Sequence, residues 1–251
     1  MKKLLLLTLV VSSTHLCLGA PQKSTDKQPW SDYYVHDMQR PHPQQIIPET
    51  PLAFKKAPAD ADILFDGSKA SMLAAWTKEW VVQEEVMIAS ATGNNKTKKS
   101  YADCELYIEW RIPAGRKVQG QKGGNSGVFL MSAYEIQVQE SHTNVTYADG
   151  QAGAIYGQYP PRVNPSLAQG EWQYYHILFK APKYDGATIL EPASITVTHN
   201  GVVIHNNQSL QGPTKHKKAT TYPKTHPSKA PLMLQWHKDP IEFRNIWIRE
   251  L

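Results

Sequence analysis

The chain carries its clearest chemical pattern between residues 124 and 141, where the sequence is GNSGVFLMSAYEIQVQES. The pattern predicts two consecutive strands, the second over residues 134–140. Because side chains alternate between the two faces of a strand, Glu135, Gln137 and Gln139 share one face, opposite the intervening apolar residues. A carboxyl group between amides suits a carbohydrate, since amides bind hydroxyl groups and a carboxyl group transfers protons. The alternative is an ordinary polar sheet face that contacts solvent.

A second polar pair is expected near the C-terminal end, in the segment LMLQWHKD. A strand over residues 232–236 would project Gln235 and His237 from one face, with apolar residues on the other. A histidine side chain titrates close to neutral pH and can therefore donate or accept a proton. We predict Glu135 and His237 as catalytic residues, each of which could act as acid or base, and Gln235 as a substrate-binding residue. The alternative for His237 is a structural histidine at the surface.

A third catalytic candidate is Glu109, in the predicted strand ELYIEWR. Arg111 shares its face, so a structural salt bridge between the two is an equal alternative. Near the C-terminus, Arg244 is the candidate for binding a substrate carbonyl or carboxylate group, because a guanidinium group presents several donors in one plane. An ion pair between Arg244 and Glu242, or another acid, is the alternative.

Two further substrate-binding candidates lie next to glycines, in addition to Gln137 and Gln139. Asn125 follows a Gly-Gly turn, which allows the backbone to approach a ligand closely. Tyr156 lies in the glycine-flanked loop GAIYGQYPP. An aromatic ring in such a loop could stack on a sugar ring, and the alternative is a residue that anchors the loop.

The histidine spacing does not favour a metal site. The sequence has ten histidines, but none occurs in the HxH or HxxxH spacing that is typical of transition-metal ligands. We therefore predict no catalytic metal and no organic cofactor.

Residues 1–20 have the features of a secretory signal peptide: two N-terminal lysines, an apolar run over residues 4–11 and the small-residue end LGA. The run is too short to span a bilayer, and no later segment reaches the ~20 apolar residues of a transmembrane helix. We expect an exported protein, periplasmic or extracellular. Only Cys104 remains after cleavage, so we expect no internal disulfide and a fold that relies on its core.

Two lysine-rich runs, over residues 94–99 and 215–218, concentrate positive charge in a chain whose formal net charge is +5 at pH 7. We expect both runs to lie in solvated loops. Because no aromatic residues are interleaved with these lysines, the runs do not favour nucleic-acid binding.

Residues 21–61 form a proline-rich N-terminal extension with few apolar residues, for which extended backbone is expected. From residue 62 to residue 251 the sequence changes to short runs of β-branched and aromatic residues separated by turns such as Asn200-Gly201. The expected strands cover residues 63–65, 80–85, 86–90, 104–111, 127–130, 134–140, 172–180, 194–199, 202–206, 232–236 and 242–249. We predict an all-β domain, a two-sheet antiparallel jelly-roll sandwich around one core.

Several of these segments resemble one family. The runs ILFDG, GGNSGVFL, YEIQVQES, GAIYGQYPP and PLMLQWHKDPIEFRNIWIREL occur in this order over residues 62–251. Together they resemble the 3-keto-disaccharide hydrolase family, which implies a concanavalin A-like jelly roll. One departure is Trp236, because the family usually has a small or acidic residue before the histidine of this motif.

The resemblance implies action on glycosides whose C3 hydroxyl group has been oxidised to a ketone. The ketone acidifies the proton on C2, so a base can remove that proton, the C1 substituent can leave, and water can add back. A separate oxidoreductase could supply the ketone. Two alternatives stay open: a non-catalytic carbohydrate-binding module with the same fold, and a classical endo-glucanase with two carboxylates.

Overall fold

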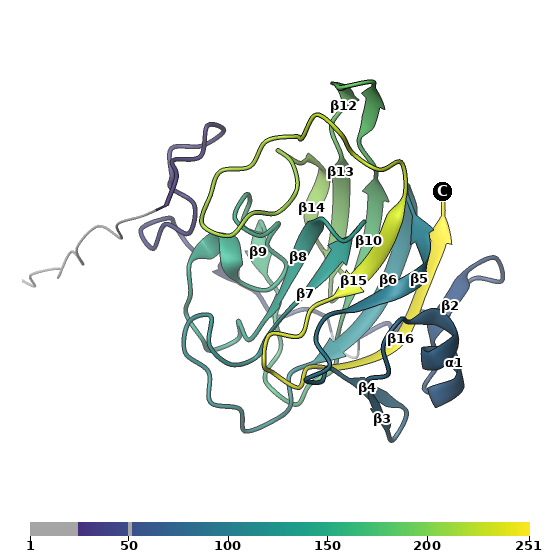
Figure 1. Cartoon of the computed structure of the whole chain (residues 1–251). Helices are drawn as coiled ribbons and strands as arrows, with labels where there is room; N and C mark the ends of the chain where they lie inside the picture. The colour runs from purple at the N-terminus through teal and green to yellow at the C-terminus, as the bar shows by residue number, and fades with distance from the viewer. Residues whose placement is uncertain (1–24, 50–51) are drawn as a thin grey trace, which may run out of the picture.

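The computed structural model describes residues 25–49 and 52–251, so the expected signal peptide lies outside the described residues. The fold is nearly all β, with two antiparallel sheets that face each other across one main core (Figure 1). The predicted all-β sandwich is therefore confirmed. In the part of the chain that is described, no helix has the length and hydrophobicity needed to cross a membrane.

The larger sheet has eight strands in the order β14-β13-β10-β6-β16-β4-β3, and β2 pairs with β16 beside β4. The strands are β2 Asp62–Phe65, β3 Val81–Gln83, β4 Val86–Ile88, β6 Cys104–Arg111, β10 Gln173–Lys180, β13 Ser194–His199, β14 Val202–Ser209 and β16 Glu242–Glu250. Along β6, Leu106, Ile108 and Trp110 belong to the main core. The odd-numbered residues of β6 therefore point to the outer face of this sheet.

The smaller sheet has four strands in the order β5-β15-β7-β8. They are β5 Asn95–Tyr101, β7 Asn125–Leu130, β8 Tyr134–Gln139 and β15 Ala230–Leu234. Along β8, Tyr134, Ile136 and Val138 belong to the main core. Glu135 and Gln137 therefore point away from the core, as the alternation of the sequence predicts.

The remaining elements are short. They are β1 Gln44–Gln45, β9 Val163–Asn164, β11 Lys183–Asp185, β12 Thr188–Glu191, the helix α1 Lys69–Ala75 and the 3-10 helix η1 Ala148–Gly150. The helix α1 begins after Ser68, whose hydroxyl group accepts a hydrogen bond from the backbone N–H of Ser71 at 3.0 Å.

The first lysine-rich run corrects one expectation. Residues 94–99 were expected to lie in a loop, but most of them belong to β5, an edge strand that pairs with β15. Asn95 and Thr97 are buried, whereas Lys96 and Lys98 point to solvent. Lysines on an edge strand prevent further strand pairing, which explains why a strand can look like a charged loop. The second run, residues 215–218, lies in a loop as expected.

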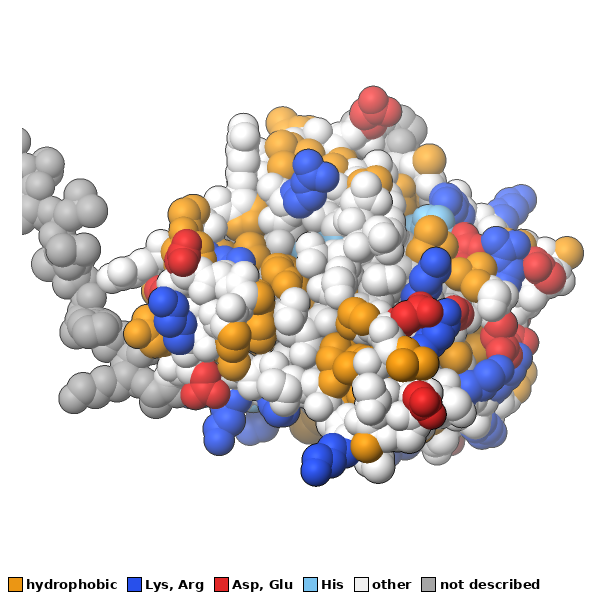
Figure 2. All heavy atoms as spheres, turned by 90° about the horizontal axis from the view of Figure 1, so that it is seen from above, with side chains coloured by type: hydrophobic (Ala, Val, Ile, Leu, Met, Phe, Trp, Pro, Cys, Tyr) orange, Lys and Arg blue, Asp and Glu red, His pale blue; other side chains and the backbone are white. Residues whose placement is uncertain are grey.

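The N-terminal extension packs on the sandwich. Its strand β1 pairs in parallel with β9. Further along, it covers part of the outer face of the larger sheet, where a small apolar cluster forms from Leu52, Ala57, Ala61, Tyr107, Tyr174 and Trp247. On the face seen from above, basic and acidic side chains are interspersed and form no continuous patch of one sign (Figure 2).

Candidate active site

A pocket of about 390 Å³ opens on the face of the smaller sheet that points away from the core. It is lined by Gln121, Asn125, Phe129, Glu135, Gln137, Tyr147, Tyr156, Thr214, His216, Gln235 and His237. Six of these residues are among the predicted site residues, and they come from β7, β8, the loop of Tyr156 and the segment after β15. The volume of the pocket is in the range of small-molecule binding sites.

Glu135 forms the floor of this pocket and is 4 % exposed. Its carboxyl group lies over Gly127 of the neighbouring strand β7, so closely that a Cβ atom at residue 127 would be 2.3 Å from Oε1 of Glu135. Among the described residues, none donates a hydrogen bond to this carboxyl group. Burial raises the pKa of Glu135 to about 8, because a charged carboxylate is poorly solvated there. The group is therefore mostly protonated at neutral pH.

Three amides beside Glu135 form a fixed network. Nε2 of Gln137 donates to Oε1 of Gln121 at 3.2 Å and to Oδ1 of Asn125 at 3.3 Å. Nδ2 of Asn125 donates to the backbone carbonyl and the side-chain carbonyl of Gln121, at 3.0 and 3.1 Å. Since the amides orient one another, they present donors and acceptors to a hydroxyl-rich ligand in a defined arrangement.

Gln139 does not line the pocket, in contrast to its predicted role in substrate binding. Its Nε2 donates to the backbone carbonyl groups of Gly120 and Gly123, at 2.8 and 3.2 Å. The side chain is fully buried at the end of β8. Gln139 therefore fixes the loop that carries Gln121, because that loop folds over the end of the strand.

Two tyrosines and a histidine form one wall. The hydroxyl groups of Tyr147 and Tyr156 are 2.8 Å apart, and the hydroxyl group of Tyr156 is 3.2 Å from Nδ1 of His216. Burial raises the pKa of both tyrosines well above the usual range. Burial also lowers the pKa of His216, and nearby basic groups, first His36, lower it further. The wall is therefore an uncharged chain of hydrogen-bonding groups at neutral pH.

His237 and Gln235 lie at the opening of the pocket. The backbone N–H of Gln235 donates to the carbonyl group of Gly127 at 2.9 Å, which continues the pairing of β15 with β7 beyond the end of β15. This pairing brings the segment after β15 to the same pocket as Glu135. The imidazole ring of His237 is exposed, and none of the described residues forms a hydrogen bond with it. Trp236 packs against the main core and does not line the pocket.

Glu109 and Arg244 do not line this pocket, although both are predicted as site residues together with Glu135. Both line a separate cavity of about 450 Å³ on the outer face of the larger sheet. Nε of Arg244 donates to Oε2 of Glu109 at 2.6 Å. Arg111 pairs with Glu242 and not with Glu109. The reason is that β6 belongs to the larger sheet, so the alternation that buries its even-numbered residues turns Glu109 to the outer face of that sheet, away from the pocket on the smaller sheet.

Five lining residues were not predicted: Gln121, Phe129, Tyr147, Thr214 and His216. Four of them come from loops that have no periodic pattern. The exception, Phe129, lies on β7 at the position paired with Glu135, so strand pairing could have identified it. In the described ranges, no group of three or more His, Cys, Asp and Glu side chains is arranged to hold a metal ion.

A model of the 3-keto-alpha-glucoside-1,2-lyase-like domain family matches residues 60–249. The crystal structure of a candidate glycosyl hydrolase from Parabacteroides distasonis ATCC 8503 is 36 % identical, with a TM-score of 0.75, over 88 % of this chain and 95 % of that chain. A second such structure from that organism is 20 % identical, with a TM-score of 0.53, over 76 % of this chain and 99 % of that chain, and supports the fold alone. No curated protein matches the chain.

Proposed function

Because the chain belongs to the family of 3-keto-alpha-glucoside-1,2-lyase-like domains, and so to the carbohydrate-active enzymes that cleave glycosidic bonds, we propose that its substrates are 3-keto-glycosides. The observation that carries this proposal is the composition of the pocket. It has one buried carboxyl group whose pKa is raised to about 8, two exposed histidines, of which His237 has no hydrogen-bond partner among the described residues, and a network of neutral amides. Elimination next to a ketone needs a proton donor, a base and sugar-binding groups, and the pocket provides each of them.

His237 is the proposed base. It removes the proton from C2, and the electron pair of the C2–H bond forms the enolate with C3. His216 is less suited to this step, because its Nδ1 is within hydrogen-bond distance of the Tyr156 hydroxyl group. His237 has no such partner in the described structure and opens to the pocket.

Glu135 is the proposed proton donor to the C3 carbonyl oxygen. A neutral carboxylic acid in an apolar environment donates a strong hydrogen bond to an oxygen that becomes negative, and so stabilises the enolate. When the enolate collapses, the C1–O bond breaks and the departing oxygen takes the proton held by His237. Water then adds its hydroxyl group to C1 and a proton to C2, which releases the 3-keto sugar.

The composition of the pocket does not favour a classical glycosidase. Such an enzyme needs two carboxyl groups on either side of the scissile bond. Among the lining residues, Glu135 is the sole acid, and Glu109 lines the other cavity. We also propose that the protein is exported and that a separate oxidoreductase forms the ketone.

The proposal is tested with a nitrophenyl 3-keto-glucoside and its unoxidised parent, by measuring the release of nitrophenol above the rate without protein. We expect release from the oxidised compound alone. Release from the parent would instead support the two-carboxylate glucanase. Binding of either compound without release would support the carbohydrate-binding module.

A further inference from the structure

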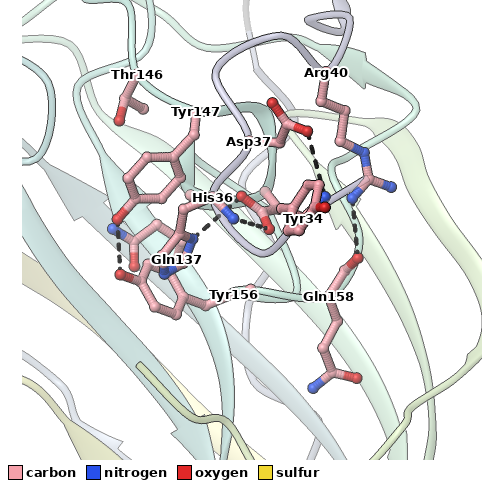
Figure 3. Close-up of polar contacts among 12 residues, drawn as sticks. Tyr34, His36, Asp37, Arg40, Gln137, Thr146, Tyr147, Tyr156 and Gln158 are labelled. Atoms are coloured by element: carbon pink, nitrogen blue, oxygen red, sulfur yellow. Dashed lines mark hydrogen bonds and ion pairs between the residues drawn. The ribbon is translucent and has the colours of Figure 1, made fainter. Parts of the chain in front are cut away.

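The N-terminal extension contributes a buried histidine to the rear of the pocket wall. His36 is 1 % exposed. Its imidazole ring stacks on Tyr147 with 4.0 Å between ring centroids, and lies tilted against Tyr156 at 4.8 Å. Figure 3 shows the ring of His36 among Tyr147, Gln137 and Tyr156, all three of which line the pocket. A segment that precedes the matched family domain therefore touches the groups that face a ligand.

A buried carboxylate fixes His36 in this place. Asp149 is fully buried. It accepts hydrogen bonds from the backbone N–H of His36 at 3.0 Å and from Nε2 of Gln28 at 3.3 Å, and its Oδ1 is 3.3 Å from Nδ1 of His36. A proton on Nδ1 satisfies the last contact. The other ring nitrogen, Nε2, is buried and has no hydrogen-bond partner among the described residues.

The same segment also connects the loops of the two tyrosines. Gln28 donates to the backbone carbonyl of Gly157, next to Tyr156, at 2.9 Å. The N–H of Gly157 donates to the backbone carbonyl of Asp149 at 2.9 Å. Gly150 allows Tyr147 to lie close, because a Cβ atom there would be 2.0 Å from the Tyr147 ring. The two tyrosine loops are thus tied to each other and to the extension.

We infer that His36 is a positioning residue for the reaction, and that the N-terminal extension is therefore a working part of the catalytic unit. This inference rests on the proposed function. The imidazole ring of His36 fixes the orientation of the Tyr147 and Tyr156 rings. The two hydroxyl groups and His216 therefore stay aligned toward the sugar. Without the ring, Tyr147 gains space to rotate, and the hydrogen-bond chain to His216 loosens. Displacements of about 1 Å in such groups cost up to ~100-fold in rate.

The test compares His36→Ala, His36→Phe and His42→Gln in the full chain. His36→Phe retains a flat ring against Tyr147. His42→Gln is the matched control, because His42 lies in the same extension and contacts the backbone carbonyl of Thr146, at 2.5 Å. Kinetics on the 3-keto-glucoside should show kcat lowered about tenfold or more in His36→Ala with KM changed little. His36→Phe should recover most of the rate, and His42→Gln should equal wild type.

A second readout separates this inference from the proposed function. In protein labelled with 13C at the tyrosine rings, the signals of Tyr147 and Tyr156, assigned with Tyr→Phe variants, should shift in His36→Ala but not in His42→Gln. Shifted signals in a protein without activity on 3-keto-glucosides would contradict the proposed function and keep the placement of His36. A kcat in His36→Ala equal to wild type, or lowered equally in His42→Gln, would overturn the inference. If His36→Ala does not fold, His36→Phe carries the test. A kcat close to wild type in His36→Phe supports the inference, and a kcat as low as that of a Tyr147→Phe variant overturns it.

Discussion

Two buried glutamates, Glu135 and Glu109, occupy similar positions in the sequence pattern, but their carboxyl groups have very different surroundings in the structure. Each is at an alternate position of a strand, and each is less than 5 % exposed, on the side of its sheet that points away from the main core. Glu109 is fully partnered, by Arg244 at 2.6 Å, Asn245 at 2.7 Å and the hydroxyl group of Tyr107 at 3.3 Å. The carboxyl group of Glu135 has no donor among the described residues.

The difference shows that partners, and not burial alone, decide whether the charge of a buried carboxyl group is compensated. The donors around Glu109 compensate its buried charge, as in a structural ion pair. Glu135 has no such compensation, so burial raises its pKa to about 8. A group that titrates close to neutral pH, in a pocket with neutral amides, is suited to proton transfer.

The Glu135→Gln substitution should have the largest effect. An amide retains the shape of the carboxyl group but cannot give up a proton, so kcat on a 3-keto-glucoside should fall by about 1,000-fold. The protein should unfold at the same temperature as wild type or higher at pH 8, because the amide has no charge to bury. Steady-state kinetics and thermal unfolding measure both quantities, and retained activity would remove Glu135 from the mechanism.

The Glu109→Gln substitution should have the opposite result. The loss of the charge leaves Arg244 poorly compensated, so the free energy of unfolding should fall by about 3 kcal/mol. The folded fraction should keep kcat within about threefold of wild type, because Glu109 lies in the other cavity. Urea unfolding and kinetics at 15 °C measure the two effects. A large loss of kcat with unchanged stability would contradict the assignment of Glu109 as structural.

The Gly127→Ala substitution should displace Glu135 without a change of its chemistry. The new Cβ atom would be 2.3 Å from Oε1 of Glu135 and 2.7 Å from the ring of Phe129. The carboxyl group must move, so we expect kcat to fall by about 100-fold. A crystal structure of the variant would show the displacement. If the carboxyl group were displaced and kcat equalled that of wild type, the native position of Glu135 on the pocket floor would not be needed for the reaction.

Stability should depend on pH in two opposite ways. The raised pKa of Glu135 gives a contribution that is complete below about pH 4.5 and is lost as pH rises through about 8. Burial lowers the pKa of His199 to about 3 and of His205 to about 4, so their contribution is complete above about pH 6.5 and is lost as pH falls. Urea unfolding from pH 4 to 9 should therefore show maximum stability near pH 6.5, where the contribution of the two histidines is complete and that of Glu135 is still partly present. The loss of stability at higher pH should be absent in Glu135→Gln.

Alternation along the strands predicted much of the fold and half of the site. It placed Glu135 and Gln137 on one strand face, and Gln235 and His237 on one face of a later segment. The pairing of β15 with β7 in the structure brings these four residues to one pocket. Alternation could not tell which outer face a residue occupies. Glu109 has a pattern like that of Glu135, but its strand belongs to the other sheet.

The residues that sequence patterns missed come from segments without a period. Tyr147, Thr214 and His216 lie in loops whose course depends on contacts across the whole chain. His36 lies in a proline-rich extension that is held by a carboxylate 113 residues away. Such contacts are set by the completed sandwich, so no local pattern in the sequence indicates them.

The most direct test of the comparison is the titration of the glutamates themselves, measured by NMR in protein labelled with 13C at the glutamate carboxyl carbons. The structure predicts one carboxyl signal with a pKa near 8, which is absent from Glu135→Gln and present in Glu109→Gln. If every glutamate titrates in the ordinary range near 4.3, or if the high-pKa signal disappears with Glu109, the pocket does not hold the unpaired acid on which the mechanism depends.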